Sequence, residues 1–173
     1  IARVRRIELL LQAVSQLSFP FHLTLAGGEE KTSSVTRTGY LNELKQLKKQ
    51  LNLESKVTFV GKKTPQELKA IYQSADIFVY PSLYENFGQP LLEAAAHGLP
   101  LISTSVGIAR DIIIEGETGY QVSGKPEEIK ERIESLRDRN LRLQMGKRIQ
   151  DEVKNRFDWG NIMDQYMSLY RSL

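Results

Sequence analysis

Two kinds of apolar segment alternate along residues 7–123, one with helical spacing and the other short and rich in β-branched residues. Helical segments place apolar side chains three or four positions apart, whereas the short runs have the length and composition of strands. The segments expected as helices are 7–17, 40–53, 64–75, 89–98 and 109–116, and those expected as strands are 21–27, 56–61, 76–82, 99–105 and 118–123. Strands that alternate with helices form a parallel sheet with both faces covered. The sequence therefore predicts an α/β fold, a Rossmann-like doubly wound parallel sheet.

Local signals mark the ends of two expected helices. Thr64 can cap the helix that follows it, Pro65 suits the first helical position, and Glu67 completes a Thr-x-x-Glu capping box. Gly98 suits a helix stop. Residues 28–38 are rich in Ser and Thr and lack periodicity, so we expect a surface loop there.

The C-terminal part of the chain contains helical patterns only, at 126–139, 140–157 and 158–173. In the last of these, apolar residues such as Trp159, Met163 and Tyr166 cover more than the single stripe that a surface helix needs. We therefore expect residues 1–173 to form one domain with extra C-terminal helices, and residues 158–173 to cross to a partner domain.

Composition excludes several kinds of protein. The sequence has no cysteine, which excludes disulfides and zinc–thiolate sites and favours a reducing compartment such as the cytoplasm. The net charge is only +3 and basic residues are scattered among acidic ones, so no nucleic-acid surface is expected. No apolar run reaches the ~18 residues of a membrane span. The chain does not begin with methionine, so we expect it to be a fragment of a longer polypeptide.

The segment PSLYENFGQPLLEAAAHGLP, residues 81–100, joins an expected strand to the next expected helix. Open α/β sheets bind ligands at the carboxyl ends of their strands, where helix N-termini offer free N–H groups. Pro90 suits the first turn of this helix and Gly88 lets the main chain approach a ligand closely. We expect the N–H groups of Gly88, Leu91 and Leu92 to be free. The segment predicts a site for a phosphate or a sugar oxygen.

Two carboxylates belong to this segment. Glu85 lies in the expected loop and Glu93 about one turn inside the expected helix, so both can face one crevice. A carboxylate accepts several hydrogen bonds and suits a vicinal diol, which favours Glu93 as a ribose binder and Glu85 as a hexose binder. The alternative is structural: Glu93 interacts with the helix dipole and Glu85 is a solvated loop residue.

The charge of a diphosphate would have to be neutralised by the protein. No Asp-x-Asp pair occurs, and His22 and His97 lie on separate elements, so no metal site is expected. Arg3, Arg5 and Arg6 precede the first helix, where a leaving diphosphate would be stabilised by them. A solvated charge run is the alternative interpretation of this basic cluster.

The stretches YENFGQPLLEAAAHGLPLIST and GIARDIIIEGETGYQV resemble the C-terminal, donor-binding domain of GT-B glycosyltransferases of family four, the retaining group that includes sucrose-phosphate synthases. The resemblance covers nearly the whole chain, and its most specific part is the setting Glu-x-Phe-Gly-x-Pro-x-x-Glu. It implies that Glu93 binds the ribose of a nucleotide sugar. The residues that it implies for the donor hexose are Glu85, Asn86, Phe87 and Gly88, and those for the diphosphate are Gly88, Gln89, Pro90 and Leu91.

Other stretches carry the resemblance further. RRIELLLQA is similar to the family's Lys-Gly-x-x-x-Leu-Leu-x-Ala stretch and places Arg5 where a diphosphate-binding lysine is expected. The family holds the base largely by main chain, which implies Val60, Gly61 and Lys62. In SVGIARDII the family's Gly-Gly-x-Pro-Glu is changed, and its second glycine and its proline are lost.

The resemblance implies an enzyme that transfers a hexosyl group from a nucleoside-diphosphate sugar to an acceptor with retention, without metal or cofactor. Glu85 and Arg5 are the expected catalytic residues, the donor is first of all a UDP-sugar, with GDP or ADP as alternatives, and the partner is an N-terminal domain of the same protein. Three alternatives stay open: a non-catalytic nucleotide-sugar-binding or scaffold domain, a GT-B sugar-nucleotide epimerase or phosphorylase relative, and a plain Rossmann-like domain. The base, the sugar and the acceptor are not specified by the sequence.

Overall fold

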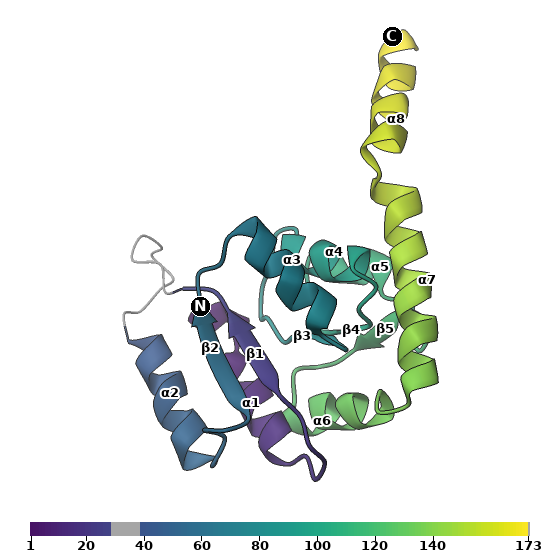
Figure 1. The fold of residues 1–173 in the computed structure, drawn as a ribbon. Coiled ribbons are helices and arrows are strands. Elements are labelled where there is room, and N and C mark those ends of the chain that lie inside the picture. Colours follow the sequence, from purple (N-terminus) through teal and green to yellow (C-terminus); the bar gives the residue numbers. More distant parts are fainter. Residues whose placement is uncertain (29–38, 173) are drawn as a thin grey trace.

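The computed structural model describes residues 1–28 and 39–172, and the expected alternation of helices and strands is confirmed (Figure 1). The helices are α1 (Ile7–Ser15), α2 (Tyr40–Gln50), α3 (Pro65–Ser74), α4 (Gln89–Ala96), α5 (Ala109–Ile112), α6 (Pro126–Ser135), α7 (Arg139–Phe157) and α8 (Trp159–Arg171), and Arg3–Arg5 form a 3-10 turn. The strands are β1 (Leu23–Ala26), β2 (Val57–Gly61), β3 (Phe78–Tyr80), β4 (Leu101–Ser103) and β5 (Gly119–Gln121). The loop expected at residues 28–38 lies, apart from Gly28, outside the described residues.

All strand pairs named here are parallel, as the alternation predicted. β1 pairs with β2 from Leu23 opposite Val57, and the register shifts between Leu25 and Ala26. β4 lies between β3 and β5. Among the described residues, hydrogen bonds join these strands into two sheets of two and three strands, in place of one continuous sheet.

Both faces of the central strand β4 are covered. Successive strand side chains point to opposite faces, and Leu101 and Ile102 are both fully buried in separate apolar clusters. The Ile102 cluster includes residues of α1 and α6, and the Leu101 cluster includes residues of α4, α5 and α7. Helices therefore pack on both sides of the strand, and the doubly wound architecture is confirmed.

The expected capping signals are present in the structure. The backbone N–H of Thr64 donates to Glu67 Oε2 at 2.8 Å, and the N–H of Glu67 donates to Thr64 Oγ1 at 3.3 Å. Pro65 is the first residue of α3, where its missing N–H costs nothing. Gly98 follows the last turn of α4 with a φ of +73°, the left-handed conformation that glycine adopts easily.

The last helix extends away from the rest of the domain (Figure 1). α8 contacts α7, and no residue of α8 is buried. Its exposed apolar side chains include Trp159, Met163, Tyr166 and Tyr170, and Trp159 is 76% exposed. The broad apolar face expected here is present, and its partner domain stays a prediction. No helix in the described residues has the length and hydropathy required to cross a membrane.

Candidate functional site

The first residues of the chain connect the carboxyl ends of β1 and β3. The amino group of Ile1 donates to the carbonyl of Gly28, just beyond β1. Val4 O accepts hydrogen bonds from the N–H of Leu83 at 2.8 Å and from Ser82 Oγ at 3.1 Å, both just beyond β3. The segment before α1 is thereby held at the edge where the loop following β3 begins.

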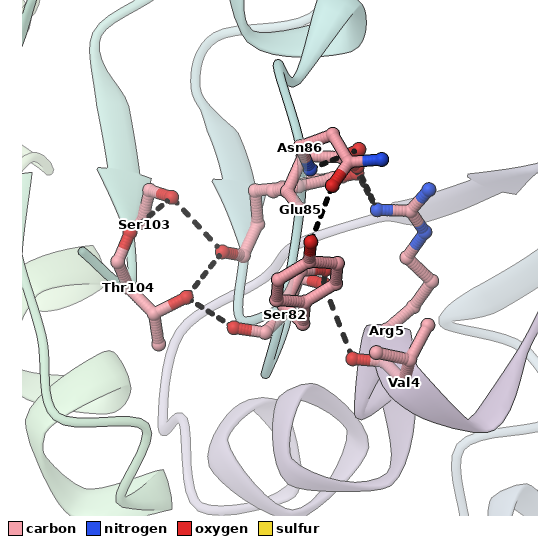
Figure 2. Close-up of polar contacts among 9 residues, drawn as sticks. Val4, Arg5, Ser82, Glu85, Asn86, Ser103 and Thr104 are labelled. Atoms are coloured by element: carbon pink, nitrogen blue, oxygen red, sulfur yellow. Dashed lines mark hydrogen bonds and ion pairs between the residues drawn. The ribbon is translucent and has the colours of Figure 1, made fainter. Parts of the chain in front are cut away.

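Buried hydroxyl groups fix this loop to the end of β4 (Figure 2). Ser103 Oγ donates to Tyr80 O at 3.1 Å, and Thr104 Oγ1 donates to Ser82 O. Ser82 and Ser103 are fully buried and Thr104 is nearly so. Buried polar groups are stable only when hydrogen-bonded, so the Ser and Thr at the end of this apolar strand give the loop a defined conformation.

Glu85 lies at the centre of this arrangement. Tyr80 Oη donates to Glu85 Oε2 at 2.6 Å, and Arg5 Nη1 donates both to the same carboxylate oxygen and to Tyr80 Oη. The side chain of Glu85 is only 16% exposed. Burial opposes ionisation of this carboxyl, but the hydrogen bonds from Tyr80 and Arg5 outweigh it and hold the pKa of Glu85 below its ordinary value. Figure 2 shows Arg5 pointing towards Glu85 from the segment before α1.

Two glycines enclose the Glu85 side chain. A Cβ at either Gly88 or Gly107 would lie 3.3 Å from Glu85 Cγ, and at Gly107 it would also lie 2.4 Å from Phe87 O. That carbonyl accepts a hydrogen bond from the N–H of Ile108 at 2.7 Å. Gly107 and Ile108, which belong to the altered Gly-Gly-x-Pro-Glu stretch, therefore contact the loop that carries Glu85.

Glu93 has its own set of partners. Tyr72 Oη, from α3, donates to Glu93 Oε2 at 3.0 Å, and Gln89 Nε2, one turn earlier on α4, donates to Oε1 at 3.0 Å. Each carboxylate oxygen thus has one protein donor. Burial, followed by the charge of Glu93, raises the pKa of Tyr72, so its hydroxyl stays protonated and donates.

The two tyrosines belong to one row of aromatic rings. The ring centroids of Tyr72 and Phe78 are 6.0 Å apart, and Phe78 is stacked on Tyr80 at 5.9 Å. His97 also stacks on Tyr72, with ring centroids 5.2 Å apart, and its Nδ1 lies 2.7 Å from Glu93 O. His97 therefore packs at the end of α4, against the ring of Tyr72. The hydroxyls of Tyr72 and Tyr80 were missed by sequence reasoning.

A cleft of about 620 Å³ opens beside Glu85. It is lined by residues 83–87 on one side and by residues 105–108, Arg110 and Asp111 on the other. Glu85, Asn86 and Phe87 were expected at one site, and the structure brings them together here. Glu93 is not among the residues that line this cleft, because its carboxylate is turned to Tyr72 and Gln89.

One expectation about the helix start is wrong. The N–H of Leu91 is not free, because it donates to Gly88 O at 2.9 Å, and the Leu91 side chain is fully buried. Gly88 itself precedes α4 with a φ of +91°, and Gln89 and Pro90 form the first turn. Gly88 is buried beneath the loop, whereas Gln89, the first residue of α4, is exposed.

The basic cluster before α1 does not act as one group. Arg3 forms two hydrogen bonds of 2.6 Å with Glu43, and Arg6 Nε donates to Pro81 O at 3.0 Å. Arg5 alone of the three contacts Glu85. Arg3 instead contacts α2, and Arg6 contacts the loop after β3.

Val60, Gly61 and Lys62 lie at the carboxyl end of β2, on the other sheet from β3. Gly61 O accepts a hydrogen bond from the N–H of Gly27 at 2.8 Å, which joins the ends of β1 and β2. Because Ile1 continues this connection from Gly28, the carboxyl ends of both sheets meet around the N-terminal segment. The described residues contain no group of three or more His, Asp or Glu side chains that could hold a metal ion.

Comparison with known proteins gives a consistent result. The family model described as glycosyl transferases group 1 matches residues 1–152. The D-inositol 3-phosphate glycosyltransferase of Corynebacterium urealyticum is 32% identical, over 100% of this chain and 42% of the relative. The chain thus spans less than half the length of this curated relative.

Solved structures with the same fold include a sucrose-phosphate synthase from Thermosynechococcus elongatus, with a TM-score of 0.86 and 32% identity over 98% of this chain and 42% of that one. HepE from Anabaena, in complex with UDP-glucose, superimposes with a TM-score of 0.88 and 22% identity, over 100% of this chain and 47% of that one. The second likeness concerns the fold alone.

Proposed function

The chain belongs to the glycosyl transferases of group 1, and on this premise we propose that it is the donor-binding half of a GT-B enzyme that transfers a hexosyl group from a nucleoside-diphosphate sugar with retention of configuration. The observation that carries the proposal is the contact of Arg5 and Tyr80 with Glu85 at the carboxyl ends of the strands. This is the edge at which open α/β sheets bind nucleotides.

The relatives support a nucleotide sugar as the ligand. The similar proteins include enzymes named D-inositol 3-phosphate glycosyltransferase and, in Bacillus anthracis, one named N-acetyl-alpha-D-glucosaminyl L-malate synthase. HepE, which shares the fold, has been solved with UDP-glucose. We therefore propose a UDP-sugar as the donor before a GDP- or ADP-sugar.

Glu93 is proposed to bind the ribose. An ionised carboxylate has about four lone-pair positions, and Tyr72 and Gln89 each use one, on different oxygens. One acceptor position on each oxygen suffices for the two neighbouring hydroxyls of a ribose. The base would lie against the main chain of Val60, Gly61 and Lys62, at the end of the neighbouring sheet.

Glu85 and the main chain of Asn86, Phe87 and Gly88 are proposed to hold the hexose. The cleft beside Glu85, with a volume of about 620 Å³, is wide enough for a sugar ring. Gln89 and Pro90 would face the diphosphate with the N-terminal end of α4, where the helix dipole favours negative charge.

Arg5 is proposed to stabilise the leaving diphosphate. When the bond between the anomeric carbon and the phosphate oxygen breaks, negative charge develops on that oxygen, and a nearby guanidinium stabilises it. The acceptor hydroxyl attacks on the same face, and its proton passes to the leaving phosphate. No side-chain nucleophile and no metal takes part in this scheme. Arg5 now pairs with Glu85, so donor binding would redistribute its hydrogen bonds.

A second domain is proposed to supply the acceptor site. The chain spans 42% of the length of the curated relative and of the solved synthase. The exposed apolar face of α8 is the surface proposed to contact that domain. The 173 residues would then bind the donor, and transfer would require the remaining part of the protein.

Calorimetric titration of the chain with UDP-glucose, GDP-mannose and ADP-glucose tests this proposal. We expect one donor to bind equally well with magnesium and with a chelator, and Glu93→Gln to weaken it by about tenfold or more, since hydrogen bonds to a charged group are lost. Glu127→Gln, which removes the same charge from the start of α6, is the control and should bind as the unchanged chain does. Equal affinity of Glu93→Gln and the control would contradict the assignment.

A further inference from the structure

We propose that Tyr80 and Tyr72 are positioning residues that hold the two glutamates of the site, Glu85 and Glu93, in the orientation that a nucleotide sugar requires. The proposal rests on the donor-binding function proposed above. Neither tyrosine lines the cleft beside Glu85, so each would act through the carboxylate that it contacts.

Both tyrosines come from rigid elements. Tyr80 is the last residue of β3, and Tyr72 lies in the last turns of α3. Their hydroxyls reach Glu85 Oε2 at 2.6 Å and Glu93 Oε2 at 3.0 Å. Glu85 itself belongs to a loop, and Tyr80 is the partner that ties its side chain to the sheet, beside Arg5 from the segment before α1.

The directions of these hydrogen bonds are determined by chemistry. Arginine has donors only, so Tyr80 Oη accepts from Arg5 and must direct its own proton to Glu85. An ionised carboxylate only accepts, so Tyr72 Oη must likewise donate to Glu93. Each carboxylate is therefore held in a single hydrogen-bonded orientation.

The aromatic row keeps both hydroxyls in place. Phe78 packs between the two tyrosines, at 6.0 Å from Tyr72 and 5.9 Å from Tyr80. His97 stacks on Tyr72 at an interplanar angle of 24°, whereas Phe78 meets Tyr72 at a tilt of 58°. A ring that is packed against its neighbours in this row cannot turn without moving them, so the positions of the two hydroxyls are linked to the core of the domain.

The consequence concerns donor affinity more than stability. Replacement of Tyr80 or Tyr72 by Phe keeps the ring and its stacking but removes the hydroxyl. Glu85 then keeps only the donors Arg5 and the N–H of Asn86, and Glu93 keeps only Gln89. With one donor fewer, each carboxylate is held less firmly in the orientation that faces the donor hydroxyls. We expect the donor affinity to fall roughly tenfold for each variant, the scale of one lost hydrogen bond to a charged group.

Tyr40 offers a matched control. Its hydroxyl donates to Glu8 and accepts from the N–H of Ile7 at 3.0 Å, and its ring is buried. Tyr40→Phe therefore makes the same chemical change, the loss of a buried tyrosine hydroxyl bound to a glutamate, without touching Glu85 or Glu93. Thermal denaturation of all three variants establishes that each is folded.

The experiment has two measurements, calorimetric titration with UDP-glucose and a carbon-13 NMR titration of the glutamate carboxyls in the free protein. We expect Tyr80→Phe and Tyr72→Phe to lower the affinity for UDP-glucose and Tyr40→Phe to leave that affinity unchanged. In the free protein, Tyr80→Phe should raise the pKa of Glu85, because one of the hydrogen bonds that lower it is removed.

The outcomes separate the two proposals. If UDP-glucose binds the unchanged chain and both site variants equally, the positioning role is overturned. If the unchanged chain binds no donor, the proposed function fails, and the carboxyl titration still tests whether Tyr80 positions Glu85. A raised pKa of Glu85 in Tyr80→Phe would support that contact, and an unchanged pKa would overturn it.

Discussion

Arg5 donates a hydrogen bond to the carboxylate of Glu85, a residue 80 positions further along the chain. The two residues are proposed to meet different parts of the donor, the diphosphate and the hexose, and in the structure they neutralise each other. Under this proposal the charges of the donor site are already paired in the free protein, and binding of the donor would redistribute their hydrogen bonds.

Replacement of Arg5 should lower the affinity for the donor more than replacement of Arg3. We expect Arg5→Ala to lower the affinity for a UDP-sugar by about tenfold, because a charge-assisted contact with the diphosphate is lost. Arg5→Lys should have a smaller effect, because lysine keeps the charge but lacks the planar guanidinium that can form two parallel hydrogen bonds. Arg3→Ala is the control, because Arg3 pairs with Glu43 instead. If calorimetry gives Arg3→Ala and Arg5→Ala the same loss of donor affinity, the assignment of Arg5 to the diphosphate is contradicted.

Gly107 should tolerate no side chain. Its φ is +47°, and a Cβ would lie 2.4 Å from Phe87 O, a backbone atom that cannot move aside cheaply. We expect Gly107→Ala to reduce the free energy of unfolding by about 3 kcal/mol and to displace the loop that holds Glu85. Gly116→Ala, at a φ of +76° with open space around it, should cost only about 1 kcal/mol. Denaturant unfolding measures both, and equal costs would refute the steric explanation.

The capping box of α3 gives the stability of the domain a pH dependence. The backbone hydrogen bond from Thr64 and then the contact with Lys63 lower the pKa of Glu67 to about 2, from an ordinary value of 4.5. A lowered pKa stabilises the fold above pH 4.5, and this contribution is lost as the pH falls towards 2. Unfolding curves should therefore show that the difference between the unchanged chain and Glu67→Gln shrinks over this window. A difference that is constant with pH would contradict the account.

Trp159 reports on the apolar face of α8. It is the single tryptophan of the sequence and is 76% exposed. We expect the fluorescence of this chain to be that of a hydrated indole and to be quenched readily by iodide. If α8 packs on a second domain, the Trp159 emission of the longer protein should shift to the blue and lose this quenching. The same spectrum in both would remove the support for that interface.

Much of the fold follows from local patterns. The spacing of apolar residues predicts each helix and strand of residues 7–123, and Thr64 and Glu67 mark the start of α3 in the sequence as they do in the structure. These features depend on residues within a few positions of one another. The split of the strands into two sheets depends instead on how distant segments pack, which no local pattern encodes.

Glu85, Glu93 and Arg5 stand out in the sequence as candidate site residues, and the tyrosines that contact the two glutamates do not. Glu85 and Glu93 are found from spacing, but Tyr80 lies in an apolar strand and Tyr72 in an amphipathic helix, where both look like core residues. One signal was available: a buried tyrosine hydroxyl needs a hydrogen-bond partner, and the strand that ends in Tyr80 is followed closely by Glu85. The N–H of Leu91 was misjudged because a tight first turn gave it Gly88 O as an acceptor.

Binding of a nucleotide sugar at the two strand ends can be located by titrating the nitrogen-15-labelled chain with UDP-glucose and following the amide resonances. We expect the largest changes at residues 85–89 and 60–62, which are proposed to hold the sugar diphosphate and the base. Changes confined to α7 or α8, or no change at millimolar donor, would contradict this expectation.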